Sequence, residues 1–102
     1  MNPNEIRFSQ SSISYRFRNG QTIDDLAEAL RSGRIGSDSV PPIRLFEKDG
    51  ILFTLDNRRL MAFRRAGVNV PWRMATAEEI AEESWKLTTT SRGLEVHVRG
   101  EP

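Results

Sequence analysis

The first clear pattern in the chain is a set of apolar residues at helical spacing. Ile23, Leu26 and Leu30 recur so that they share one face of a helix. Thr22 is a good N-cap residue, and the two aspartates that follow Ile23 favour a helix start. The pattern therefore predicts a helix from Ile23 to about Arg31.

Two more helices are predicted further along the chain. One runs from about Asn57 to Ala66, and Gly67 is suited to end it in the left-handed conformation. The other opens at the capping box formed by Thr76 and Glu79 and extends to about Trp85.

Short apolar runs predict the strands of a small sheet. Ile43–Glu47 and Ile51–Leu55 flank Lys48-Asp49-Gly50, and the Asp-Gly pair is typical of a β-hairpin turn. Val68–Met74 is predicted as a further strand, and Pro71 within it indicates a sheet edge or a bulge.

The two ends of the chain supply the remaining predicted strands. Glu5–Ser9 is expected to be a short edge strand. Leu87–Thr90 and Leu94–Arg99 are predicted to form a terminal hairpin around the turn Ser91-Arg92-Gly93. Residues 1–102 are therefore predicted to form one α+β domain with a small mixed sheet and about three helices.

Composition narrows the class of protein. The chain has 102 residues, 37% of them hydrophobic, so it has room for one modest core, in which we expect both Trp72 and Trp85. It has no cysteine, which excludes disulfides, zinc-thiolate sites and thiol nucleophiles. No run approaches the roughly 18 apolar residues of a membrane span, and Met1–Gln10 has no apolar region of a signal peptide. We therefore expect no membrane partner.

The formal net charge of +1 conceals an uneven distribution. Met1–Ala77 carries a net charge of +4, whereas Glu78–Pro102 carries −3. Thirteen of the fifteen basic residues are arginines, whose planar guanidinium donates two parallel hydrogen bonds to a phosphate. Codon bias in a GC-rich genome also explains such an excess of arginine, so composition alone leaves both interpretations open.

The polar turn Asp56-Asn57-Arg58-Arg59 carries the strongest chemical signal. It lies at the start of the second predicted helix, where free N–H groups and the positive end of the helix dipole form an anion site. The two arginines add charged donors, and Asp56 or Asn57 is placed to cap the helix while facing the same ligand. Phosphate is the natural ligand. In the alternative interpretation, Asp56 is only an N-cap and the arginines are only solvated.

The order of elements around this turn resembles the ParB and sulfiredoxin superfamily. The matching features are Val40-Pro41-Pro42-Ile43, the Asp-Gly hairpin, the Asp56–Arg59 turn, Ala66-Gly67 and Val70-Pro71. The resemblance covers most of residues 23–75. It implies a ParB/sulfiredoxin-like fold in which the turn binds nucleotide or nucleic-acid phosphate. Asn57 stands where sulfiredoxin has its catalytic cysteine, so sulfinic acid reduction is excluded.

The whole chain resembles small ParB-like domains at the C-termini of bacterial polymorphic toxins of the Rhs type. The matching segments are Ile6–Ser14, Phe46–Gly50, Thr54–Leu60 and the helix start Met74-Ala75-Thr76. This resemblance implies a toxin that is delivered as the tip of a larger secreted protein and acts in the cytoplasm of a rival cell. It also implies a cognate immunity protein as partner. The superfamily includes nucleases, nucleotide hydrolases and a kinase, so the reaction stays open.

Polar and basic residues near the N-terminus are candidate ligands of the same phosphate. The polar ones, which equally suit a solvated loop, are Ser9, Gln10 and Ser11. The basic ones, which alternate with aromatic residues, are Arg7, Arg16 and Arg18. This alternation is typical of a nucleic-acid surface, and it also describes an amphipathic strand with its aromatic side chains inward. The arginines face outward in both interpretations.

A nuclease also needs a base that activates its nucleophile or carboxylates that hold a divalent metal. We assign these roles to Glu47 and Asp56, as a base or as ligands of Mg²⁺ or another divalent ion. His97, the only histidine, is a further candidate base if the fold brings it to the turn. A lone histidine on a β-strand is more often a surface or packing residue, so we keep that role as the alternative.

Together these expectations describe a monomeric toxin nuclease that cuts the DNA or RNA of rival cells. Arg58 and Arg59 bind the phosphate and stabilise the charge that develops on it, while Asn57 orients it. Two alternatives remain. One is an enzyme that consumes ATP or CTP at the same turn, and the other is a non-catalytic module that binds nucleic acid or protein.

Overall fold

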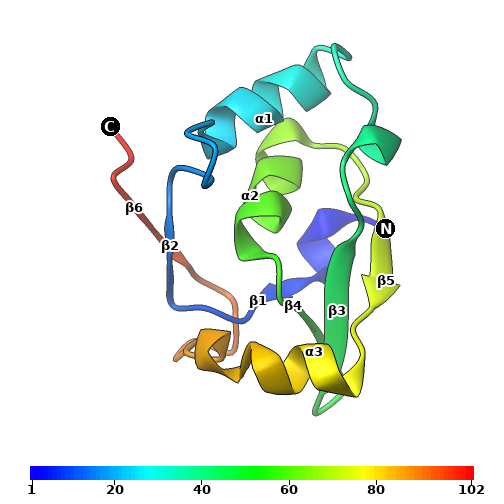
Figure 1. Ribbon diagram of the computed structural model, residues 1–102, viewed down its shortest axis with the longest axis vertical. Helices are drawn as coiled ribbons and strands as arrows, with labels where there is room; N and C mark the ends of the chain where they lie inside the picture. The colour runs from blue at the N-terminus through cyan, green and yellow to red at the C-terminus, as the bar shows by residue number, and fades with distance from the viewer.

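The computed structural model describes every residue from Met1 to Pro102 and has the predicted α+β class. Two helices, α1 (Ile23–Arg31) and α2 (Asn57–Ala66), pack against each other beside a mixed sheet (Figure 1). A short third helix, α3 (Ala77–Glu82), crosses the lower end of the sheet. Three 3₁₀ segments complete the helical elements: η1 (Pro3–Glu5), η2 (Ser37–Ser39) and η3 (Ser84–Lys86).

Four strands form the main sheet in the order β1-β4-β3-β5. They are β1 (Arg7–Phe8), β3 (Ile43–Lys48), β4 (Ile51–Thr54) and β5 (Trp72–Met74). Strands β3 and β4 are antiparallel around the predicted turn, in which Asp49 and Gly50 both have positive φ angles. Strands β1 and β5 run parallel to their neighbours at the two edges of the sheet. The predicted hairpin and the predicted edge strand at the N-terminus are therefore confirmed.

The predicted terminal hairpin is wrong. The last strand, β6 (His97–Arg99), pairs in parallel with β2 (Ser12–Ser14) from the other end of the chain. Residues 87–90 form no strand, and the N–H groups of Thr88 and Thr89 bind the carbonyl oxygen of Ser9 instead. The pairing of β2 with β6 places Val98 beside Ile13 against the main core, so burial of apolar surface favours this distant partner.

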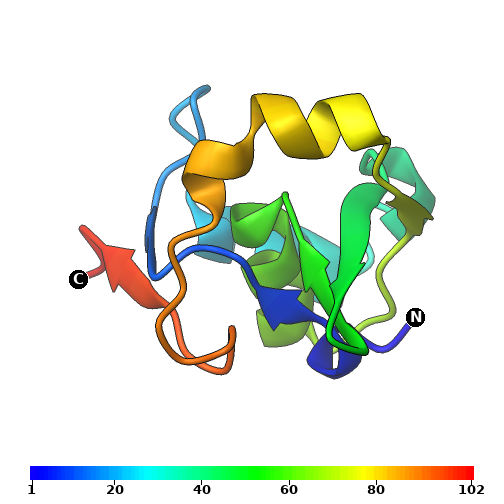
Figure 2. The ribbon, with the colours of Figure 1, turned by 90° about the horizontal axis from the view of Figure 1, so that it is seen from below.

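Helix boundaries agree with the predictions where local capping sets them. Thr22 accepts a hydrogen bond from the N–H of Asp25 at the start of α1, and Gly67 ends α2 with a φ angle of 71°. Helix α3 begins at its predicted capping box but ends at Glu82, and η3 continues the chain (Figure 2). None of these helices has the length and apolar character needed to cross a membrane.

The two faces of β3 contact different parts of the molecule. Ile43 and Leu45 are buried in the main core with residues of α1 and α2. Because side chains alternate along a strand, Arg44 and Phe46 lie on the opposite face, toward α3. This second face carries the ionic contacts that position the candidate site.

Neither tryptophan lies in the core, so that expectation is wrong. Trp72 is 45% exposed, because it lies on the edge strand β5, whose residues are all exposed. Trp85 is 66% exposed, and it lies on η3 at the edge of a pocket. The apolar interior is filled by smaller side chains and phenylalanines instead.

Candidate phosphate-binding site

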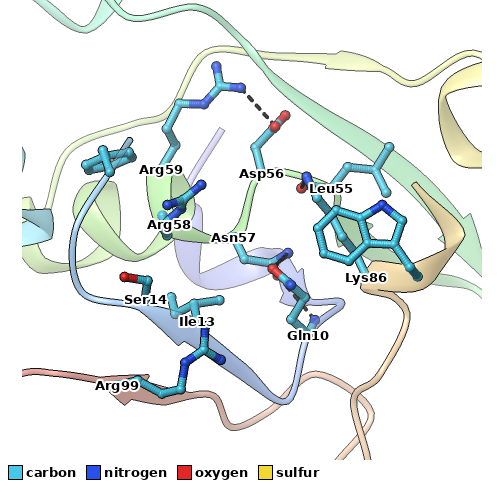
Figure 3. Close-up of a pocket in the computed structure, with 12 residues that line it drawn as sticks. Gln10, Ile13, Ser14, Leu55, Asp56, Asn57, Arg58, Arg59, Lys86 and Arg99 are labelled. Atoms are coloured by element: carbon cyan, nitrogen blue, oxygen red, sulfur yellow. Dashed lines mark hydrogen bonds and ion pairs between the residues drawn. The ribbon is translucent and has the colours of Figure 1, made fainter. Parts of the chain in front are cut away.

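A pocket of about 260 Å³ opens at the start of α2. Figure 3 shows Arg58 and Arg59 extending from α2, Arg99 from β6, and Lys86 on the opposite side. The other lining residues are Gln10, Ile13, Ser14, Phe17, Leu55, Asp56, Asn57 and Trp85. The fold thus brings four cations from three separate elements around one cavity.

The start of α2 has no side-chain cap. Asp56 occupies the N-cap position, but neither it nor Asn57 accepts a hydrogen bond from the first turn, so the expected capping role is wrong. The backbone N–H groups of Asn57, Arg58 and Arg59 have no partner within the protein. These three donors and the positive end of the helix dipole lie at the pocket, where they favour an anion.

Arg58 is a guanidinium without a carboxylate partner. It donates a 2.9 Å hydrogen bond to the carbonyl oxygen of Arg16 and lies 5.5 Å from the centre of the Phe17 ring. Burial, together with the positive charges of Arg18, Arg59 and Arg99, lowers the pKa of Arg58. A bound anion would relieve the repulsion between Arg58 and these neighbouring positive charges.

Arg99 is also without a carboxylate partner. Its guanidinium donates to the hydroxyl of Ser12, across the pairing of β2 with β6, and it makes no ion pair. The pocket therefore contains two arginines whose charge the protein does not compensate, Arg58 and Arg99.

Asp56 is buried, and both of its carboxylate oxygens are occupied. One oxygen accepts 2.8 Å contacts from the guanidinium groups of Arg44 and Arg59. The other accepts from the backbone N–H of Arg44 at 2.8 Å and from its Nε at 3.1 Å. Burial alone would raise the pKa of Asp56, but Arg44 and Arg59 bring it below its ordinary value. Asp56 therefore positions Arg59 and is a poor base.

Arg44 lies at the centre of a larger ionic cluster that sequence reasoning missed. Its guanidinium contacts Asp56, Glu79 and Glu83, and hydrogen bonds to Asp56 and Glu83 raise its pKa. The visible signal in the sequence is a charged residue inside the apolar run Ile43–Phe46. The cluster joins α3 and η3 to β3, and so holds one wall of the pocket in place.

We expect the chain to lose stability in acid. Hydrogen bonds from Arg73 and other partners lower the pKa of Glu79, and Arg44 and Lys86 outweigh burial to lower that of Glu83. The pKa of Asp56 is lowered as well. The unfolded values are about 3.9 for Asp and about 4.3 for Glu, so these groups contribute stability above about pH 4.5 and lose it as the pH falls through their folded-state values. Urea unfolding between pH 7 and pH 2 should show a steady midpoint down to about pH 5 and a decline below pH 4. A midpoint that rises below pH 4 contradicts this assignment.

Asn57 and Ser9 are engaged inside the protein, so their expected role as phosphate ligands is not supported by their geometry. Asn57 Oδ1 accepts from the N–H of Ser9 at 2.8 Å, and its Nδ2 donates to Ser9 Oγ at 3.0 Å and Gln10 Oε1 at 3.1 Å. The hydroxyl of Ser9 donates to the carbonyl oxygen of Thr54 at 2.6 Å. These contacts fix the crossing from β1 to β2 against the start of α2. The side-chain NH₂ of Gln10 makes no hydrogen bond within the protein, and Gln10 lines the pocket.

The other proposed base and metal ligands are not brought to this pocket. Glu47 is exposed and lies on the face of β3 opposite to Arg44, the residue that holds Asp56. His97 is exposed and lines a separate pocket with Ser11. No group of three His, Cys, Asp or Glu side chains is arranged to hold a metal. The residues present therefore do not fit a divalent ion held between Asp56 and Glu47.

The basic residues near the N-terminus are divided between two places. Arg18 lies close enough to Arg58 to lower its pKa, and Arg16 binds Arg58 through its backbone carbonyl. Both are exposed, but the Arg16 guanidinium donates to the carbonyl oxygen of Gly20 and lies near Asp25, so only Arg18 extends the basic surface beside Arg58. Arg7 instead donates to the carbonyl oxygen of Arg92 and does not line the pocket. The alternating run forms only an isolated bridge between Arg16 and Thr22 and not a full strand.

Lys86 and Arg99 are pocket residues that the sequence did not single out. They belong to the acidic C-terminal part of the chain, where net charge hides individual cations. Lys86 reaches the pocket by donating a 2.9 Å hydrogen bond to the carbonyl oxygen of Leu55. Only the tertiary fold brings these residues to α2, and no local pattern signals it.

Comparison with known proteins identifies no family for this chain. No protein-family model, curated protein or solved structure matches it. The resemblance to the ParB and sulfiredoxin superfamily therefore stays a prediction that rests on the motifs of the sequence.

Proposed function

We propose that this chain binds a backbone phosphate of nucleic acid at the start of α2 and cleaves the phosphodiester there, as a toxin domain. The uncompensated charge of Arg58 is the observation that supports the proposal most strongly. Its guanidinium has no carboxylate partner, and it lies among like charges beside three unpaired N–H groups. A phosphate supplies the negative charge that this arrangement lacks.

The basic surface favours a polyanion over a small phosphate ester. Arg18 lies outside the pocket, is exposed, and is close enough to Arg58 to lower its pKa. A nucleic-acid strand carries a phosphate at each nucleotide, so a neighbouring phosphate can engage Arg18 while one occupies the pocket.

Electrostatic stabilisation is the chemistry that these residues provide. In hydrolysis, the oxygen of a water molecule bonds to phosphorus while the bond to the leaving ester oxygen breaks. The attacking water loses a proton to solvent and the leaving oxygen takes one up, while negative charge grows on the non-bridging oxygens of the phosphate. Arg58 and the free N–H groups of α2 stabilise this charge, and Asp56 holds Arg59 in place to assist them. Donors placed in this way typically contribute about 100-fold to 1,000-fold to a rate.

The second candidate is a module that binds nucleic acid without cleaving it. Asp56 is the only carboxylate that lines the pocket, and cations occupy both of its oxygens. No free side-chain base therefore lines the cavity to activate a nucleophile, and this observation favours binding without cleavage.

Incubation of the purified chain with different phosphate compounds tests the proposal. The substrates are labelled single-stranded DNA, RNA, duplex DNA, ATP and CTP, each with and without magnesium. An Arg58→Ala preparation, purified in parallel, controls for contaminating nucleases. Cleavage of a polynucleotide by the wild type alone supports the proposal, and binding without cleavage supports the second candidate. Consumption of ATP or CTP without polynucleotide cleavage, or no interaction with any substrate, overturns the nuclease proposal.

The toxin role is tested by inducible expression in bacteria. A toxin nuclease should reduce colony formation when its immunity partner is absent. Normal growth, with the wild-type protein present and folded in the cells, contradicts the toxin role and leaves the binding site to be judged by the biochemical assay.

A further inference from the structure

Trp85 is an exposed aromatic residue at the phosphate pocket. It is 66% exposed on η3, although its indole is among the largest apolar groups in the chain. Burial of such a side chain is ordinarily favourable, and an exposed tryptophan beside a polar cavity is suited to contact a ligand.

The residue that follows Trp85 anchors this segment to the phosphate site. The next residue, Lys86, donates to the carbonyl oxygen of Leu55, directly before the turn that begins α2. Lys86 also pairs with Glu83, which in turn contacts Arg44. The indole is therefore presented at a defined place beside the pocket and not on a free loop.

A second aromatic residue lines the same cavity. Phe17 belongs to the loop after β2, and the guanidinium of Arg58 lies 5.5 Å from the centre of its ring. The ammonium of Lys86 lies 5.5 Å from the centre of the Trp85 ring. Each aromatic ring in the pocket is thus accompanied by a cation. Proteins that bind single strands combine such surfaces, because bases stack on the rings while cations neutralise the phosphates.

We propose that Trp85 stacks on an unpaired nucleobase next to the phosphate bound at the start of α2, so that the substrate is a single-stranded nucleic acid. This inference rests on the proposed function. In a duplex, base pairing and stacking on both faces leave no base free to meet the indole. Arg58 supplies affinity for the backbone, and Trp85 supplies the preference for unpaired strands.

Binding measurements on matched variants test the inference. The probe is a fluorescent single-stranded oligonucleotide with phosphorothioate linkages that resist cleavage. We expect Trp85→Ala to weaken its binding at least about fivefold, and Trp85→Phe to retain most of the affinity. Trp72→Ala removes the other exposed tryptophan, which lies on β5 and outside the pocket, and should leave binding unchanged.

Salt dependence and a base-free probe separate stacking from charge. Trp85→Ala should leave the slope of log affinity against log salt unchanged, because it removes no cation. It should also leave binding of an abasic oligonucleotide unchanged. In a Trp72→Phe background, Trp85 is the only tryptophan, and its fluorescence should be quenched by the single strand.

The results of these measurements separate the stacking role of Trp85 from the proposed binding and cleavage of nucleic acid. A wild-type protein that binds no oligonucleotide overturns the proposed function. A wild-type protein that binds the single strand, with Trp85→Ala binding equally well, overturns the stacking role alone. Equal affinity of the wild type for duplex and single strand overturns it too.

Discussion

Replacement of Arg58 by alanine should reduce phosphodiester cleavage at least about 100-fold while the chain stays folded. Arg58 makes one hydrogen bond, to a backbone carbonyl, and no ion pair, so little native structure depends on it. Its loss also removes repulsion with Arg18, Arg59 and Arg99. We therefore expect the free energy of unfolding to change by no more than about 1 kcal/mol, the value of one ordinary hydrogen bond. Initial cleavage rates and urea unfolding of the two proteins measure both quantities.

Binding provides a readout of the Arg58 substitution that does not require catalysis. The slope of log affinity for a single strand against log salt should become shallower by about 0.7, because one phosphate contact is lost. Arg58→Lys keeps the charge but loses the planar fork, so its cleavage rate should lie between those of the wild type and Arg58→Ala.

Arg34→Ala is the matched control for Arg58→Ala. It removes one exposed arginine that makes no ion pair and lies outside the pocket, so it should leave both cleavage and binding unchanged. A folded Arg58→Ala protein with the cleavage rate and salt slope of the wild type would exclude Arg58 from the site.

Local signals predicted the helices and the hairpin, because each is stabilised by residues close together in the sequence. Thr22 with Asp25 begins α1, and Asp49-Gly50 supplies the positive φ angles of the hairpin turn. The parallel pairing of β2 with β6 joins segments about 85 residues apart, as Ser12 and His97 show. No turn geometry or spacing sets the register of such a distant pair, so the sequence instead favoured a local hairpin for the last strand.

The candidate site was predictable to the same extent. The helix start with Arg58 and Arg59 follows from a polar turn between a strand and a helix, and the structure places both at one pocket. The roles of Asn57 and Ser9 were not predictable, because a polar side chain in sequence does not reveal whether the protein itself uses its hydrogen bonds. The ionic environment of Asp56 was hidden for a similar reason, since the sequence does not show which charged side chain of the neighbouring strand β3 turns toward it, and Arg44 does so.

Replacement of Arg44 by methionine should destabilise the chain by about 3 kcal/mol or more at neutral pH. Its side chain is 19% exposed, and its guanidinium is shared by Asp56, Glu79 and Glu83. Without it, the buried carboxylate of Asp56 keeps Arg59 as its only cation beside the backbone N–H of residue 44, and removal of one partner from a buried ion pair typically costs about 3–5 kcal/mol. That is a large part of the roughly 5–15 kcal/mol that stabilises a small domain. Urea unfolding at pH 7 measures the difference.

Arg73→Met is the matched control, because Arg73 is the neighbour of Arg44 in the pairing of β3 with β5. Arg73 also pairs with Glu79, but its side chain is 49% exposed, so solvent screens this pair and its loss should destabilise the chain much less than the loss of Arg44. The deficit of Arg44→Met should also shrink at about pH 3, because protonated carboxyls no longer need the cation. Equal costs for the two variants at pH 7, or an Arg44→Met deficit that is independent of pH, would show that the ionic cluster does not stabilise the wall of the pocket.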